Sequence, residues 1–135
     1  MPLSMENTDQ QGEIFQRVRD EARKANWDFV DKHIVSTLNP KTLFWAVREG
    51  LTDADGNIRD FAASMLEKSD YPISSEIALT IHALLKHDPN RFVRFRLAFA
   101  LFKRDDHSDL VMDTMQEAAE DADVSEIAIG YLEGK

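Results

Sequence analysis

The chain has 135 residues, a formal net charge of −9 at pH 7, and no cysteine. Its length suits one domain with a sizeable core, and the missing cysteine excludes disulfides, thiolate nucleophiles and cysteine-ligated zinc or iron–sulfur sites. Because it shows no signal-peptide pattern and no apolar run near the ~20 residues of a membrane span, we expect a cytoplasmic protein without a membrane segment.

The start of the chain is polar, and a helical pattern follows it. We expect a flexible polar N-terminus over residues 1–12 and a single helical-repeat domain over residues 13–135. Apolar residues recur at helical spacing along residues 14–25 and again along residues 30–38. This periodicity predicts two helices that form a divergent first pair.

A capped helix is predicted next. Asn39 followed by Pro40 is a typical helix start, and the apolar stripe behind it ends near Gly50. Trp45 lies off that stripe, which makes this aromatic side chain a candidate for contact with a partner.

The following stretch resembles a calcium loop only superficially. Asp53, Asp55 and Asn57 alternate like calcium ligands, but the positions that need glycine and glutamate hold Ile58 and Ser64. The stretch therefore predicts a turn and a helix cap rather than a metal site.

Four more helices are predicted from the breaks in the second half. The breaks lie at residues 70–72, 88–90, 105–108 and 121–123, and each contains turn-forming residues such as Asp, Pro, Asn or Ser. An apolar stripe at helical spacing follows each of them. The chain as a whole therefore predicts an all-α fold of about eight helices joined by short turns.

The segment 91–104 is apolar on two sides, with four phenylalanines on one of them. One interpretation makes it the central helix of the fold, covered on both sides by neighbours. The other places Phe95 and Phe99, with Arg96 and Asp60 beside them, on a concave surface that binds a partner. The sequence leaves both interpretations open.

An internal repeat links three of the predicted helices. Ile58, Val93 and Val124 open equivalent segments 35 and 31 residues apart, and small and apolar residues follow at matching offsets. An acidic turn precedes the first apolar residue of each unit, and in two of the three units an arginine follows that residue. In these features the units resemble HEAT repeats. The resemblance covers residues 41–133 and implies a short right-handed α-α superhelix that binds a partner on its concave face.

Four charged residues recur at equivalent positions of the repeat. An arginine at this position can reach the aspartate of a neighbouring turn and nearby carbonyl groups. We therefore interpret Asp55, Arg59, Asp88 and Arg94 as a structural ladder between repeats, which would stop at the third unit because Ser125 replaces the arginine there.

The net charge is concentrated at the end of the chain. Residues 105–135 contain ten acidic residues and one basic residue, whereas the remaining residues are neutral overall. Such a surface repels a phosphate backbone, which disfavours nucleic acid as a partner. A protein partner with a basic patch is favoured instead.

No catalytic constellation is visible. The four histidines are dispersed, and neither a metal-ligand set nor a nucleophile motif is present, so we expect no metal and no cofactor. We predict a non-catalytic protein–protein interaction module or adaptor. One alternative is an enzyme-assisting subunit similar to HEAT-like bilin lyases, which a buried carboxylate in a pocket near Phe99 would favour. Another is an acidic inhibitor or immunity-type protein against a basic enzyme. A homodimer through either end of the stack is a third, because the last helix has apolar residues such as Ile127 and Ile129 on more than one side.

Overall fold

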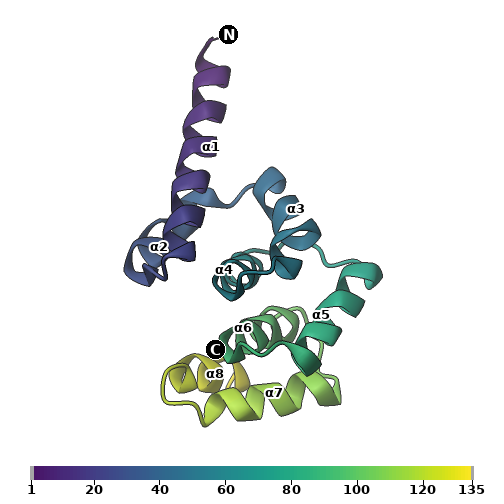
Figure 1. The fold of residues 1–135 in the computed structure, drawn as a ribbon. Helices are drawn as coiled ribbons and strands as arrows, with labels where there is room; N and C mark the ends of the chain where they lie inside the picture. The colour runs from purple at the N-terminus through teal and green to yellow at the C-terminus, as the bar shows by residue number, and fades with distance from the viewer. Residues whose placement is uncertain (1, 135) are drawn as a thin grey trace. The chain divides into compact units, whose positions relative to one another are not determined.

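A computed structural model describes the backbone of residues 2–134 and the side chains of residues 12–134. These residues form eight α-helices and two short 3-10 helices, and they contain no strand (Figure 1). The prediction of an all-α chain of about eight helices is thus confirmed. The elements are α1 (Pro2–Arg23), α2 (Trp27–His33), η1 (Ile34–Thr37), α3 (Pro40–Arg48), η2 (Gly50–Thr52), α4 (Gly56–Glu67), α5 (Ser75–His87), α6 (Arg91–Phe102), α7 (Asp109–Ala119) and α8 (Ser125–Leu132).

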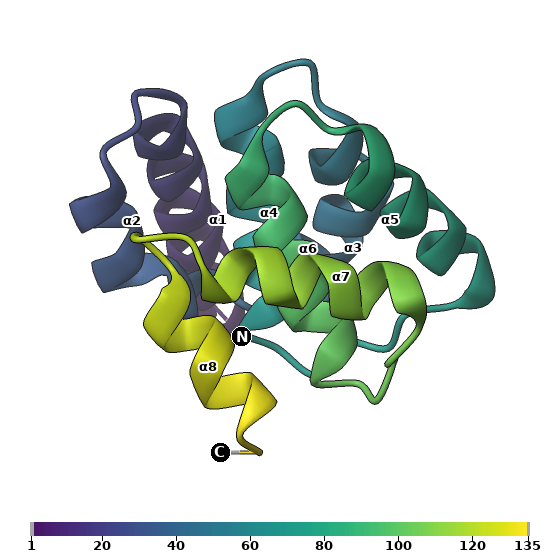
Figure 2. The same cartoon turned by 90° about the horizontal axis from the view of Figure 1, so that it is seen from below.

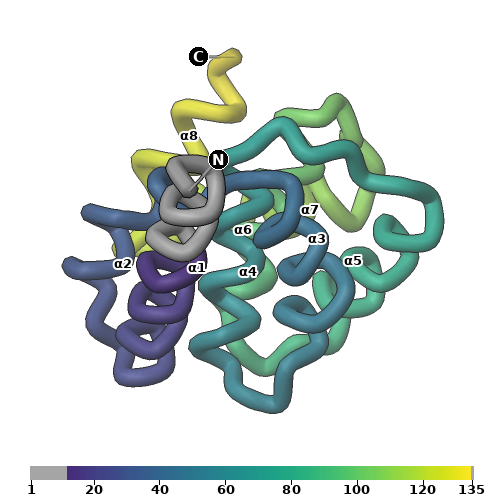
Figure 3. The backbone as a smooth tube through the Cα atoms, turned by 90° about the horizontal axis from the view of Figure 1, so that it is seen from above, coloured from purple at the N-terminus to yellow at the C-terminus, as the bar shows by residue number. Residues whose placement is uncertain are grey.

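Two compact units make up the chain, residues 1–65 and residues 66–135, where the sequence predicted one domain over residues 13–135. In the first unit, α1 lies against α2 and η1, and α3 lies against η2 (Figure 3). In the second unit, α6 contacts α5, α7 and α8, and α7 also contacts α5 and α8 (Figure 2). The division falls near the end of α4, whose last two residues belong to the second unit.

The first helix begins earlier than the sequence suggested. The backbone is helical from Pro2, whereas a flexible segment was predicted over residues 1–12. Proline is tolerated in the first turn of a helix, and the residues that follow include several good helix formers. A polar composition therefore does not prevent helix formation in this segment.

Three of the predicted helix starts are confirmed by their caps. The side chain of Asn39 accepts a hydrogen bond from the backbone N–H of Thr42 at 3.0 Å, and the Thr42 hydroxyl accepts one from the Asn39 N–H at 3.1 Å, which makes a capping box at α3. Ser74 caps α5 and Asn90 caps α6 in the same way, with one bond each. These bonds satisfy N–H groups that the first helical turn leaves free.

Two helices end on non-glycine residues with a left-handed backbone. Ala25 follows α1 with φ 61°, and Asp105 follows α6 with φ 67°. At the first of these, the N–H groups of Ala25 and Asn26 bind the carbonyls of Ala22 and Glu21, both at 2.9 Å. This pattern is a Schellman motif, in which glycine is the usual residue at the left-handed position.

Both sides of α6 are covered, as expected for a central helix. Phe95 is 1% exposed and Phe99 is 0% exposed, and Val93 and Leu97 on the other side are fully buried. This finding corrects the expectation that Phe95 and Phe99 line an exposed concave surface, because neither ring reaches solvent. The spacing of the four phenylalanines does not show whether they are buried, since a stripe that packs in the core and a stripe that contacts a partner have the same spacing.

The end of α4 and the loop behind it are held by Arg104. Its guanidinium donates to the carbonyl oxygens of Leu66 at 3.2 Å, Ser69 at 2.9 Å and Tyr71 at 2.9 Å, and to that of Ala100 at 2.8 Å. The Arg104 Nε atom donates to Tyr71 as well, at 3.1 Å. One cationic side chain thus binds carbonyls at the end of α4 and in the loop behind it.

Candidate functional site

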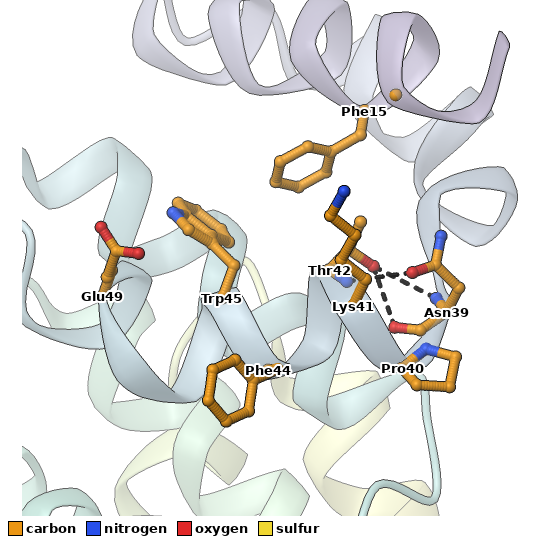
Figure 4. Close-up of a pocket in the computed structure, with 9 residues that line it drawn as sticks. Phe15, Asn39, Pro40, Lys41, Thr42, Phe44, Trp45 and Glu49 are labelled. Carbon is orange, nitrogen blue, oxygen red and sulfur yellow. Dashed lines mark hydrogen bonds between the residues drawn. The ribbon is translucent and has the colours of Figure 1, made fainter. Parts of the chain in front are cut away.

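A pocket lies between α1 and α3 of the first unit. Its volume is about 730 Å³. Among the described residues, it is lined by Gly12, Phe15, Asn39, Pro40, Lys41, Thr42, Phe44, Trp45 and Glu49 (Figure 4). Three of these nine are aromatic, and α3 with its two cap residues, Asn39 and Glu49, supplies all of the others except Gly12.

The aromatic part of the pocket rests on the core. The rings of Phe15 and Trp45 meet edge to face with centroids 5.2 Å apart. Both also contact Phe61, at 6.0 Å and 6.1 Å, and Phe61 is fully buried. Aromatic pairs in such geometries gain roughly 0.5–1.5 kcal/mol beyond burial of their area. The lining rings of α1 and α3 therefore share a buried support.

A cation covers the same two rings. The Arg19 guanidinium lies 5.2 Å from the centroid of Phe15 and 5.5 Å from that of Trp45. Its Nε atom is buried without a hydrogen-bond partner among the described residues. This arrangement favours one orientation of Phe15 and Trp45.

Gly50 explains how Trp45 fits against its own helix end. A Cβ atom at Gly50 would lie 2.7 Å from the Cβ of Ala62 and 3.0 Å from two carbons of the Trp45 ring. Real side chains do not approach so closely. Glycine is therefore required at position 50 for the indole to occupy its place beside the pocket.

The face that α3 presents to the pocket has apolar rings in the middle and opposite charges at its ends. Phe44 is 52% exposed, and Trp45 is half-buried. Lys41 lies toward one end of α3 and Glu49 toward the other, with Trp45 between them and Phe15 reaching over from α1 (Figure 4). The pocket thus offers an apolar surface between a cation and an anion.

Of the contact residues that the sequence suggested, only Trp45 belongs to this pocket. Asp60 is buried and accepts a hydrogen bond from the Ser64 hydroxyl at 3.5 Å. Arg96 forms an ion pair with Glu67 at 3.3 Å. Asp60 belongs to the first unit, whereas Arg96 and the buried Phe95 and Phe99 belong to the second.

The other lining side chains, chiefly Phe15, Lys41, Phe44 and Glu49, were not predicted from the sequence. A signal for Phe44 was present, because it is adjacent to Trp45 and the two rings cannot both point into the core. Phe15 carried no comparable signal, since its partner on α3 is 30 residues away in the sequence.

Two residues of the predicted ladder, Arg59 and Arg94, contact the turn that precedes their own helix. The Arg59 guanidinium donates to the carbonyls of Asp53 at 2.9 Å and Ala54 at 3.2 Å, and Arg94 donates to that of Asp88 at 2.8 Å. Each arginine therefore binds the turn before its own helix. Arg94 also reaches Glu117 of α7 at 3.2 Å.

The turn around Asp55 has the cap geometry that the sequence predicted. Asp53 accepts a hydrogen bond from the N–H of Asp55 at 2.8 Å, and Asp55 accepts one from the N–H of Asn57 at 2.8 Å. Asp55 also lies 3.7 Å from the Arg23 guanidinium. These carboxylates serve the backbone of the turn.

A buried carboxylate, Glu67, lies near Phe99, but the enzyme alternative also required a pocket around Phe99, and the pocket between α1 and α3 includes neither residue. Glu67 accepts hydrogen bonds from Arg96 at 3.3 Å and from the Tyr131 hydroxyl at 3.1 Å, and the Tyr131 ring stacks on Phe99 at 5.3 Å. Burial, together with the Glu67 charge, raises the pKa of Tyr131, so the hydroxyl stays protonated and donates. Both oxygens of Glu67 are thus engaged, one by Arg96 of α6 and the other by Tyr131 of α8.

Within the described residues, no group of three His, Asp or Glu side chains is placed to hold a metal ion. Nor does any described helix combine the length and the apolar character that crossing a bilayer requires. Comparison of the chain with models of protein families, with curated proteins and with solved structures finds no match.

Proposed function

We propose that this chain is a non-catalytic protein-binding module, and that its pocket between α1 and α3 receives an apolar side chain of a protein partner. The observation that carries the proposal is the aromatic lining: exposed Phe44 and half-buried Trp45, with Phe15, in a pocket of about 730 Å³. Aromatic residues are enriched in the few positions that dominate binding energy at interfaces.

The rigidity of the lining supports the same function. Phe61 lies beneath the rings, Arg19 lies over them, and Gly50 makes room for the indole. A surface that is already ordered loses little side-chain entropy when it binds. The pocket is therefore suited to recognition without rearrangement.

The chemistry of the lining favours binding over catalysis. Among its described residues, Glu49 is the one carboxylate and it is exposed, and none is a histidine. The hydroxyl of Thr42 donates to the carbonyl of Thr37 at 2.6 Å, so it serves the end of η1. No described lining residue pairs a nucleophile with a base.

The frame that carries the pocket is, in this proposal, a HEAT-like right-handed stack of helical hairpins. The repeat that begins at Ile58, Val93 and Val124 supports it, because α4, α6 and α8 cover these segments. In such a stack the second helix of each hairpin, here α4, α6 and α8, lines the concave face.

A second candidate surface for a basic protein lies in the acidic second unit. Within residues 105–134 of this unit, six exposed carboxylates form no ion pair with a described residue: Asp105, Asp109, Asp113, Glu120, Glu126 and Glu133. A surface of this kind speeds encounter with a basic partner, as an inhibitor of a basic enzyme would need. Binding there would depend steeply on salt.

Affinity capture with matched variants tests the main proposal. We would compare the unchanged protein with Phe44→Ala and with Val35→Ala, which removes a 68% exposed apolar side chain outside the pocket. We expect Phe44→Ala to lose at least tenfold of the captured partner and Val35→Ala to retain it. Equal retention by all three folded proteins would reject the pocket as the site.

A further inference from the structure

We propose that the partner segment is an amphipathic helix in which an acidic and a basic side chain flank the apolar anchor. The acidic side chain would lie at Lys41 and the basic one at Glu49. This inference rests on the proposed function of the pocket and adds the chemistry of its occupant.

The pocket has one positive and one negative side chain among its described lining residues. Among the described lining residues, Lys41 and Glu49 are the two that carry a charge. Both are exposed, and neither forms an ion pair with a residue whose side chain is described. Arg48 is next to Glu49 in the sequence, but its guanidinium lies over the ring of Phe44, 5.2 Å from the centroid.

The spacing of these two charges along α3 favours a helical partner. Lys41, Trp45 and Glu49 are four residues apart, so they form one row along α3. At 1.5 Å per residue, the row spans about 12 Å between its charged ends. Rows of this kind fit the grooves of a second α-helix, which favours a helix over an extended segment as the occupant.

The dipole of α3 adds to the side-chain charge at each end of the helix. Lys41 lies in its first turn, where the helix dipole is positive, and Glu49 follows its last residue, where the dipole is negative. The dipole therefore has the same sign as the side-chain charge at each end. A segment with one acidic and one basic side chain complements both ends, whereas a segment with two like charges is repelled at one.

Synthetic helical peptides bound to the whole chain test this inference. Each peptide has a central leucine, with the pair Glu/Lys, Glu/Glu, Lys/Lys or Gln/Gln placed four residues before and after it. Fluorescence anisotropy of labelled peptides at low salt gives the affinities. We expect Glu/Lys to bind more tightly than Gln/Gln by about three- to fivefold for each matched charge, and the difference to shrink at high salt.

Charge reversals on α3 provide the matched controls. Lys41→Glu should make Lys/Lys the preferred peptide, and Glu49→Lys should make Glu/Glu the preferred one. The double variant should prefer Glu/Lys again, because the peptide can bind in the opposite direction. All three changes are at exposed positions, so circular dichroism should show unchanged folding.

The outcomes separate this inference from the proposed function. If Gln/Gln binds the unchanged protein as well as Glu/Lys does, or if the single reversals leave the ranking unchanged, the inference about charge is wrong while the apolar pocket stands. If no peptide binds at all, or if Phe44→Ala leaves binding of Gln/Gln unchanged, the proposed function fails and this inference fails with it.

Discussion

Replacing Arg104 by alanine should destabilise the second unit far more than the loss of an exposed cation such as Lys68. The guanidinium makes five hydrogen bonds of 2.8–3.2 Å to the carbonyls of Leu66, Ser69, Tyr71 and Ala100. Three of these carbonyls belong to the end of α4 and the loop behind it. Alanine would leave them all without this donor.

The expected magnitude follows from the environment of Arg104. A hydrogen bond to a charged group contributes about 1.5–3 kcal/mol when its partner would otherwise be buried and unpaired. Arg104 is only partly buried, so water replaces some of the lost bonds and the contributions do not add. We expect a loss of about 2–4 kcal/mol in the free energy of unfolding.

Arg104→Lys refines the same prediction. Lysine keeps the charge at the end of α4 but has one donor group in place of the planar fork, so it cannot reach all the carbonyls at once. We expect this variant to lose about half as much stability as the alanine variant, roughly 1–2 kcal/mol.

Urea unfolding followed by circular dichroism at 222 nm measures both variants. Lys68→Ala is the matched control, because Lys68 is an exposed cation near the end of the same helix, and we expect it to change stability by less than about 0.5 kcal/mol. If Arg104→Ala unfolds within about 0.5 kcal/mol of the unchanged protein, as the control does, the carbonyls are satisfied without it and the reasoning is refuted.

Three further predictions concern other features of the fold. Ala25→Gly should raise the free energy of unfolding by about 0.5–1 kcal/mol in thermal or urea unfolding, because φ is 61° there and glycine adopts it without a steric penalty; a decrease would contradict the assigned helix end. Gly50→Ala should lower stability by about 1–3 kcal/mol and alter Trp45 fluorescence in a Trp27→Phe background, because the new Cβ would lie 3.0 Å from the indole; an unchanged spectrum would mean that the ring does not lie there. Asp106→Asn should lower the free energy of unfolding at pH 7 by about 0.5–1 kcal/mol. Burial raises the pKa of Asp106, but the hydrogen bonds from Ser108 and His82 have the larger combined effect, so the pKa is lowered in the folded protein. Since the pKa of Asp106 is lower in the folded state, this stabilisation is present above the unfolded pKa of about 3.9 and is lost as the pH falls through the folded value. Urea unfolding should therefore show a smaller difference in the free energy of unfolding between the variant and the unchanged protein at pH 3 than at pH 7. An equal difference at both pH values would contradict the assignment.

The helices were predictable because local rules determined them. The apolar stripe of α3 begins at an Asn-Pro pair, and the sequence placed its start where the capping box is found. The turn at Asp55 was assigned correctly because the calcium-loop pattern fails at two positions that such a loop needs. Periodicity and caps act over a few residues, so the sequence displays them directly.

The pocket was not predictable, because it depends on which helices meet. Phe15 lines it only because α1 lies near α3, and periodicity within one helix does not reveal its neighbours. Phe95 and Phe99 failed as contact residues for the same reason: α6 is covered on the side where they lie. Trp45 could be singled out from the sequence because a large aromatic ring off the apolar stripe of its helix is unusual, and it lines the pocket.

The hydrogen bond between Tyr131 and Glu67 has a consequence for synthesis of the chain. It joins residues 64 positions apart, so the contact cannot form until Tyr131 has left the ribosome. The contacts of Phe15, Trp45 and Phe61, in contrast, lie within the first 65 residues. Since domains fold as they are made and distant contacts form slowly, the aromatic cluster has time to assemble on the nascent chain while α8 is still being translated.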